Sequence, residues 1–209
     1  MKKKHSSKKY WVLGFILLLV LSILFTYYIY FYPKTSVKSM SSDIKINNLD
    51  LGKKFIPNDI KFSLKELSVK SQTKFSEEEL TDLFIASFNE YPQIKDILKG
   101  LKITINSDKI NMYLHFNYKG IPLEGKVTFT AYSTDGKGIF HYEEGNVGFF
   151  SIPKDVIFQS FEDTLFFQFD KSKGDIILSF PGLKQLQVTK ISAHDKFIQI
   201  DFQGLLKLQ

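Results

Sequence analysis

The sequence predicts an α+β domain that follows one membrane-spanning helix. Three observations support this fold class: an uncharged run of 23 residues near the N-terminus, alternation of apolar and polar residues in several later segments, and two stretches of helical periodicity between them. Alternation indicates antiparallel strands with one face in water, and the order of the elements contains no βαβ unit. We therefore expect long, curved antiparallel strands with helices to cover their apolar face.

The uncharged run, residues 10–32, is typical of a transmembrane helix. At 1.5 Å per residue it crosses a hydrocarbon core of roughly 30 Å. Tyr and Trp begin the run and four Tyr lie near its end, as in interfacial aromatic belts. A secretory signal peptide is the alternative, but its apolar region usually has about 7–15 residues and precedes a small-residue cleavage site. This run is longer and ends in Tyr32-Pro33, which favours an uncleaved anchor.

The lysines predict the orientation of that helix. All 28 basic residues are Lys, five of them lie within residues 1–9, and no acidic residue precedes Asp43. The positive-inside rule therefore puts the N-terminus in the cytoplasm. We expect a cytoplasmic tail at 1–9, a membrane helix at 10–32, a polar stem at 33–43 and an extracytoplasmic domain at 44–209, held at the cell membrane.

The net charge of +6 belongs to the tail. The rest of the chain has 23 Lys against 22 acidic residues, and it has no Arg to form bidentate contacts with phosphates and base edges. Nucleic acid is therefore not an expected partner.

The first part of the outer domain is predicted to form strands followed by a helix. Residues 60–69 suggest an extra pair of strands or one bulged strand. A capping box at 76–79 begins a helix whose apolar stripe runs to Tyr91. Pro92 is expected to kink or restart this helix, which then continues to Gly100.

The clearest strands predict a four-strand meander. Apolar residues alternate strictly with polar ones in the two central segments, and Ser107-Asp108 and Asp135-Gly136 supply turns. The four predicted strands are 101–105, 109–118, 121–131 and 137–144.

A second helix and three more strands complete the domain. The helix begins at Pro153, a favourable first helical position, and three strands follow around 176–180, 186–188 and 198–202, with a turn at Asp195-Lys196. One face of the predicted helix carries Val156, Ile157, Ser160, Phe161, Thr164 and Leu165.

No catalytic or metal-binding motif is recognisable. The absence of Cys excludes disulfides, thiolate metal sites and a Cys nucleophile, and there is no nucleophile elbow, phosphate-binding loop or zinc-protease helix. We interpret His115, His141 and His194 as solvated strand or turn residues. The acidic clusters at 77–79 and 143–144 are explained by helix capping and a hairpin. We therefore expect no enzyme activity, no cofactor and no metal.

Aromatic residues are abundant beyond the anchor, with 18 Phe and five Tyr after Pro33. They either fill an ordinary core or line a groove for an acyl chain, which needs apolar walls with few polar groups. A strand of ten residues is ~33 Å long, comparable to a lipid tail. The candidate groove residues are Ile110, Met112, Leu114 and Phe116 from one strand, Val127 and Phe129 from its neighbour, and Ile157, Phe161 and Leu165 from the second helix.

The chain resembles the YpmS-like family of single-anchor envelope proteins from low-GC Gram-positive bacteria. The resemblance lies in the order of a charged tail, a single anchor, and the segments SEEELTDLF, LKITINSDKINMYLHFNYKGIPLEGKVTFTAY, GNVGFFSIPKDVIFQSF and DIILSFPGLKQLQVTKISAHDKFIQIDFQG. More loosely, the chain is similar to LmeA-like proteins; the resemblance covers roughly residues 71–205. It implies a tubular lipid-binding type of fold, with a curved sheet wrapped around two helices and an apolar groove. The family offers no established catalytic residues to transfer.

Two functional hypotheses follow. The first is a membrane-anchored, extracytoplasmic module that holds or transfers a lipid or a lipid-linked envelope precursor, so that membrane lipid is its partner. The alternative is a non-catalytic accessory subunit that binds another protein of an envelope or secretion complex, with the aromatic residues serving only as core. An envelope hydrolase is a minor third hypothesis, disfavoured by the missing catalytic motifs.

Overall fold

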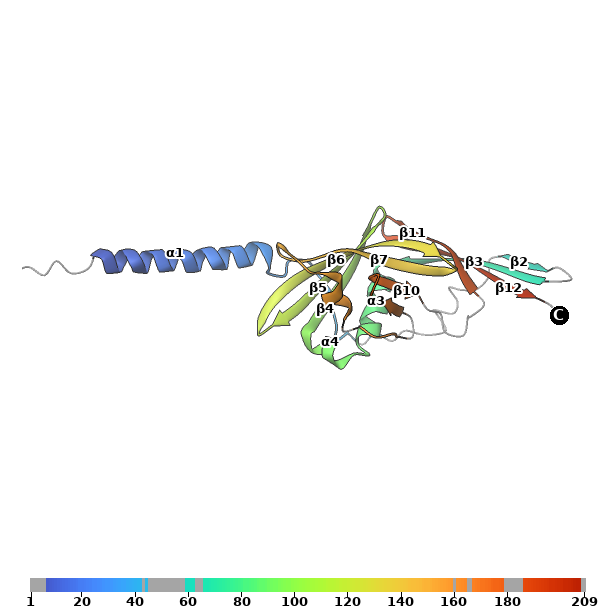
Figure 1. Cartoon of the computed structure of the whole chain (residues 1–209), viewed down its shortest axis with the longest axis horizontal. Coiled ribbons are helices and arrows are strands. Elements are labelled where there is room, and N and C mark those ends of the chain that lie inside the picture. Colours follow the sequence, from blue (N-terminus) through green and yellow to red (C-terminus); the bar gives the residue numbers. More distant parts are fainter. Residues whose placement is uncertain are drawn as a thin grey trace, which may run out of the picture.

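The computed structural model describes residues 7–42, 44, 59–62, 66–159, 161–164, 167–178 and 186–207. In Figure 1 the molecule is elongated. Helix α1 (Ser7–Tyr30) extends from one end, and strands β2 (Asp59–Phe62), β3 (Glu66–Ser76) and β12 (Phe197–Lys207) reach the opposite end.

Helix α1 is long and apolar enough to cross a membrane. Its apolar part, Lys9–Tyr30, has 22 residues and none of its most apolar stretch is buried inside the protein. At 1.5 Å per residue this part is ~33 Å long, which matches a hydrocarbon core of roughly 30 Å. A single membrane-spanning helix is therefore compatible with the predicted anchor.

Most of the domain is one antiparallel sheet built on the predicted meander. Strands β4 (Leu98–Asn106), β5 (Lys109–Tyr118), β6 (Ile121–Thr134) and β7 (Lys137–Val147) are consecutive neighbours in it. The order of the sheet is β1-β4-β5-β6-β7-β10-β9, and β8 also pairs with β7. The four strands outside the meander are β1 (Lys38–Ser39), β8 (Phe150–Ser151), β9 (Phe167–Asp170) and β10 (Asp175–Leu178).

The turns of the meander have the backbone that their residues predict. Asp135 and Gly136, between β6 and β7, have φ values of 49° and 74°. Positive φ at both positions is the geometry of the tight hairpin turn that Asp-Gly favours. Ser107, between β4 and β5, also has a positive φ of 56°.

A second antiparallel sheet contains the remaining strands in the order β11-β12-β3-β2, where β11 is Leu186–His194. Residues 66–76 of β3 pair along their full length with residues 197–207 of β12. Strands β2 and β3 pair with each other, so the prediction of an extra strand pair before the first helix is confirmed.

Helix α3 (Glu77–Phe88) begins at the predicted capping box. The Ser76 hydroxyl accepts a hydrogen bond from the Glu79 amide at 3.2 Å, and the Glu79 carboxylate accepts one from the Ser76 amide at 2.9 Å. Helix α4 (Pro92–Ile97) restarts at Pro92, as expected, but gives way to β4 at Leu98. The predicted continuation to Gly100 is therefore too long.

The second predicted helix is much shorter than its apolar pattern suggests. Helix α5 spans only Lys154–Phe158. Beyond it the Asp163 carboxylate accepts the Phe169 amide at 2.8 Å and the Thr164 hydroxyl accepts the Phe167 amide at 3.0 Å. Short polar side chains that bind nearby backbone in this way compete with helix formation, so the chain turns into β9 instead.

The core lies between the meander, α3 and the second sheet. Helices α3 and α4 lie together against one side of the meander (Figure 1), and the Phe84 ring of α3 stacks on Phe167 at 4.5 Å. The most deeply buried large side chains are Ile85, Leu101, Ile103, Ile105, Phe158, Phe167, Ile198, Ile200 and Phe202.

Residues of the predicted stem belong to the folded domain. Lys38 and Ser39 form β1, which pairs with Leu101 and Gly100 of β4. The following Met40 is only 3% exposed and belongs to the hydrophobic core. The Ser- and Lys-rich composition predicted only a polar stem, yet burial of the Met40 side chain packs this segment against the domain.

Candidate apolar sites

Six of the nine predicted groove residues line one cavity. Met112, Leu114, Val127, Phe129, Ile157 and Phe161 surround a core cavity of about 30 Å³ together with Phe88, Phe158, Phe169 and Ile176. Ile110 is buried and Phe116 is half-buried against the core, but neither lines the cavity. Leu165 lies outside the described residues.

Strand register and alternation bring the predicted residues together. In the pairing of β5 with β6, Met112 lies opposite Val127 and Ile110 lies opposite Phe129. Because side chains alternate between the two faces of a strand, these residues share one face of the sheet. Of the cavity residues that the prediction missed, Phe88 stands on the predicted helix stripe and Ile176 on a predicted strand.

A cover of aromatic residues closes the cavity. Phe161 comes just after α5, not from within a helix as predicted, and its ring stacks on Phe88 at 5.0 Å and on Phe169 at 5.1 Å. Phe158 is 1% exposed, and its ring lies edge-on to Tyr142 of β7 at 6.2 Å. We call residues 153–159 and 161–164 the cover segment.

The core cavity is small and wholly apolar in its lining. Its volume is close to the space that one water molecule occupies in the liquid. A cavity of this kind, without polar groups, stays dry. The cavity as it stands is too small for an acyl chain.

A larger apolar groove lies where the helix α1 meets the domain. This junction groove has a volume of about 540 Å³. Ser22, Ile23, Thr26 and Tyr27 of α1 form one wall with Phe31, and the sheet supplies the other wall with Tyr118, Ile121, Leu123, Val147 and Phe150. This groove could not be predicted from the sequence, because its two walls are about 100 residues apart in the chain.

Hydrogen bonds fix the helix to the domain at this groove. The Tyr27 hydroxyl donates to the Pro122 carbonyl at 2.8 Å, and the Glu124 amide donates to the Phe31 carbonyl at 2.9 Å. The Phe31 ring packs on Phe149 at 5.2 Å. Gly148 has a φ of 59°, and a Cβ at this position would collide with the Phe31 ring.

The Glu124 carboxylate binds the segment that leaves the helix. Its Oε2 accepts the backbone amides of Lys34 at 3.0 Å and Thr35 at 2.8 Å, and it lies 3.1 Å from Nε2 of His115. Burial alone would raise the pKa of Glu124, but the hydrogen bonds from Thr35, Lys34 and His115 outweigh burial and hold this pKa below its ordinary value. His115, interpreted from the sequence as a solvated strand residue, is therefore part of a half-buried polar contact.

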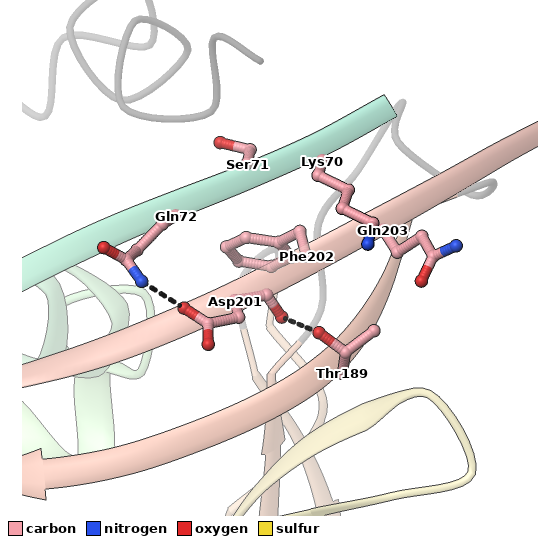
Figure 2. Close-up of a pocket in the computed structure, with 7 residues that line it drawn as sticks. All are labelled: Lys70, Ser71, Gln72, Thr189, Asp201, Phe202 and Gln203. Carbon is pink, nitrogen blue, oxygen red and sulfur yellow. Dashed lines mark hydrogen bonds between the residues drawn. The ribbon is translucent and has the colours of Figure 1, made fainter. Parts of the chain in front are cut away.

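A third hollow lies on the second sheet, toward the end of the molecule opposite α1. Its volume is about 410 Å³ and its lining is mainly polar: Lys70, Ser71, Gln72, Thr189, Asp201, Phe202 and Gln203. Figure 2 shows the Gln72 amide donating to the Asp201 carboxylate at 2.9 Å and the Thr189 hydroxyl donating to the Asp201 carbonyl at 3.1 Å. Lys70 and Asp201 are the two titratable side chains of this lining.

The other two described outer His residues also have polar partners. Nδ1 of His141 lies 2.6 Å from Oδ1 of Asp175, which is 3% exposed, so the pair links β7 to β10. Nε2 of His194 lies 3.3 Å from the exposed hydroxyl of Ser192. Asp195, next to His194, instead accepts the Ser107 amide at 3.1 Å, which agrees with its predicted role in a turn.

Carboxylates and imidazoles do not gather into a metal site within the described part of the chain. No group of three or more His, Asp or Glu side chains there is close enough to hold a metal ion.

Comparison of the chain with protein-family models, curated proteins and solved structures finds no match.

Proposed function

We propose that this protein is a membrane-anchored, non-enzymatic module that binds a lipid or a lipid-linked envelope precursor outside the cytoplasm, to hold it or pass it on. Helix α1 is the anchor, its lysine-rich N-terminal side faces the cytoplasm, and the β-rich domain stands on the outer side of the cell membrane. The YpmS-like resemblance of the sequence agrees with this assignment.

The observation that carries the proposal is the purely apolar lining of the core cavity. All ten lining side chains are apolar, and they come from β5, β6, β9, β10, α3 and the cover segment. A site for an acyl chain needs such walls. We expect the cover segment to move away from the sheet at this cavity, so that an acyl chain of the lipid can enter between them.

The cover segment is suited to such a movement. Its helix α5 has only five residues, and isolated helices of that length have little stability of their own. It also begins three residues after Phe150, which lies with Phe149 beside the end of α1. A lipid leaving the membrane at this point reaches the cover segment first.

Photolabelling tests the proposal on the full chain. The protein is reconstituted into vesicles that contain a phospholipid with a diazirine in its acyl chain, irradiated, and digested with trypsin. We expect label on the peptide 155–171, which carries Ile157, Phe158, Phe161 and Phe169, in addition to label on α1.

Two variants that introduce a charge distinguish lipid bound in the cavity from lipid that only touches the surface of the cover segment. Phe161→Asp puts a carboxylate where the acyl chain would lie, so the label on peptide 155–171 should be lost. Val156→Asp introduces the same charge at a side chain that is 57% exposed on α5 and should keep the label. Label confined to α1 in the wild-type protein would contradict lipid binding by the domain; a stable protein partner recovered from the membrane would then favour the accessory-subunit hypothesis.

A further inference from the structure

We infer that two loop tips of the domain are embedded in the outer leaflet, so that lipid acyl chains fill the junction groove. The first tip, residues 117–122, joins β5 to β6; the second, residues 147–150, joins β7 to β8. The inference rests on α1 being the membrane anchor of the proposed function, but it does not depend on lipid entering the core cavity.

Exposed apolar side chains are concentrated on these tips. After Pro33, seven large apolar side chains of the described residues are exposed, and four of them lie on the two tips. Their exposed fractions are 59% for Tyr118, 50% for Ile121, 58% for Phe149 and 60% for Phe150. Contiguous exposed apolar surface of this kind marks an interaction site.

The membrane is the occupant because the tips lie beside the membrane-spanning helix. Tyr118 and Ile121 share the junction groove with Ser22 and Ile23 of α1. Ile23 precedes the end of α1 at Tyr30 by seven residues, which corresponds to ~10 Å along the helix axis. Since the apolar part of α1 is little longer than a hydrocarbon core, groove residues ~10 Å before its end lie within the outer half of that core, and the tips that share the groove lie in the outer leaflet.

The polar groups of the tips also suit a lipid interface. Lys119 is the only charged residue in the two tips, and its Nζ lies 5.4 Å from the centre of the Tyr118 ring. Lys34, at the exit of α1, is placed similarly over Tyr28 at 5.8 Å. A long Lys side chain can reach phosphate headgroups while its stem stays in the apolar layer, and Tyr is favoured at the same level.

The apolar face of β5 continues past the core toward the tip. Ile110 and Met112 are buried, Leu114 and Phe116 are half-buried, and Tyr118 is exposed on the same face. An apolar face that runs out of the core is expected where the surrounding medium changes from protein to lipid. The hydrogen bond from Tyr27 to Pro122 holds this tip against the helix.

Fluorescence quenching tests the inference on the full chain. Trp11 is the only Trp, so a Trp11→Phe background allows single reporters at the tips, Tyr118→Trp and Phe150→Trp. The protein is reconstituted into vesicles of phosphatidylglycerol and phosphatidylcholine, the latter brominated in its acyl chains. We expect each tip reporter to lose at least half of its emission relative to vesicles without bromine.

Two further Trp reporters serve as controls for the quenching at the tips. Tyr132→Trp replaces an aromatic residue that is 41% exposed near the other end of β6, up to ~36 Å from Ile121 along the strand, and should not be quenched. Phe25→Trp lies in α1 and should be quenched strongly. Quenching of Phe25→Trp without quenching at the tips would overturn the inference and leave the anchor intact, whereas absence of quenching at all sites would overturn the anchor itself. Blue-shifted but unquenched tip reporters would mean that protein, and not lipid, covers the tips.

Discussion

At the level of single residues, Glu124 shows how a strand pattern can predict a position and miss its role. Alternation in 121–131 correctly opposes Glu124 to Leu123 and Val127, but it suggests a solvated carboxylate. The structure surrounds Glu124 with donors from Lys34 and Thr35, about 90 positions earlier in the chain. Contacts over such separations leave no periodic signal, so a single sequence could not predict this one.

Replacement of Glu124 should loosen the connection between α1 and the domain. Glu124→Gln removes the charge that accepts two backbone amides, and charge-assisted hydrogen bonds of this type contribute about 1–3 kcal/mol. We expect trypsin to cleave the folded protein after Lys34 about tenfold faster or more in this variant. Glu144→Gln, at an exposed position of β7, is the matched control and should leave the rate unchanged. Equal rates in the two variants would contradict the structural role of Glu124.

The same carboxylate predicts a pH dependence. Because the pKa of Glu124 is lower in the folded protein than its ordinary value, its contribution to stability is complete above that ordinary value. The contribution is lost as the pH falls through the lowered folded pKa. The chemical shift of the Thr35 amide should report this titration with a midpoint below the ordinary Glu value. A midpoint at or above the ordinary value would show that burial outweighs the hydrogen bonds.

At the level of elements, α3 protects an edge of the main sheet. Along β4 beyond the short strand β1, the backbone amides of Ile103 and Ile105 donate to side chains of α3. The acceptors are the Thr81 hydroxyl at 3.0 Å and the Glu77 carboxylate at 2.7 Å. An uncovered edge strand is prone to pair with other chains, so these side chains both satisfy the edge and orient the helix.

Loss of the Thr81 hydroxyl should therefore destabilise the domain. Thr81→Val keeps the shape of a side chain that is 5% exposed but leaves the buried Ile103 amide without its acceptor. An unsatisfied buried donor costs about 1–3 kcal/mol, so the free energy of unfolding should fall by that amount in denaturant titrations. Thr81→Ser retains the hydroxyl and should recover most of the loss. A Val variant as stable as the wild type would mean that the amide finds another acceptor.

The elements that the sequence predicted best are those with a local cause. The strands 109–118 and 121–134 follow from period-2 alternation, and α3 follows from its capping box. Helix α5 was overestimated because its apolar spacing continues through Phe161 while Asp163 and Thr164 bind the backbone of β9. The six cavity residues were predicted from strand faces and helix spacing; Phe169 was missed because no strand was predicted between the second helix and residue 176, where β9 lies.

At the level of the whole molecule, the first question is which side of the membrane holds the domain. The chain has no Cys, so single Cys residues report their location without background. We expect Lys137→Cys, at the exposed first residue of β7, to react with a membrane-impermeant maleimide in intact protoplasts. Ser6→Cys, on the lysine-rich side of α1, should react only after permeabilisation. The reverse pattern would invert the topology and exclude an extracytoplasmic function.

The second question is where the independent domain begins. The sequence suggested a boundary near Asp43, but β1 and Met40 lie before it and are integrated into the sheet and core. The Met40 amide donates to the Lys99 carbonyl at 3.0 Å, and the Asn89 side chain donates to the Met40 carbonyl at 3.1 Å. A fragment of residues 34–209 should thus be more stable than a fragment of residues 44–209.

The expected difference between the two fragments is several kcal/mol. Truncation of a buried Met to Ala alone costs about 2–5 kcal/mol, and the shorter fragment also loses the pairing of β1 with β4. Unfolding midpoints in denaturant would measure the difference, and Met40→Ala in the longer fragment would isolate the side-chain part. If both fragments unfold at the same midpoint, residues 34–43 act as a free stem. If the longer fragment is the more stable one, the exit from α1 is part of the fold, and the anchor holds the domain through a rigid connection.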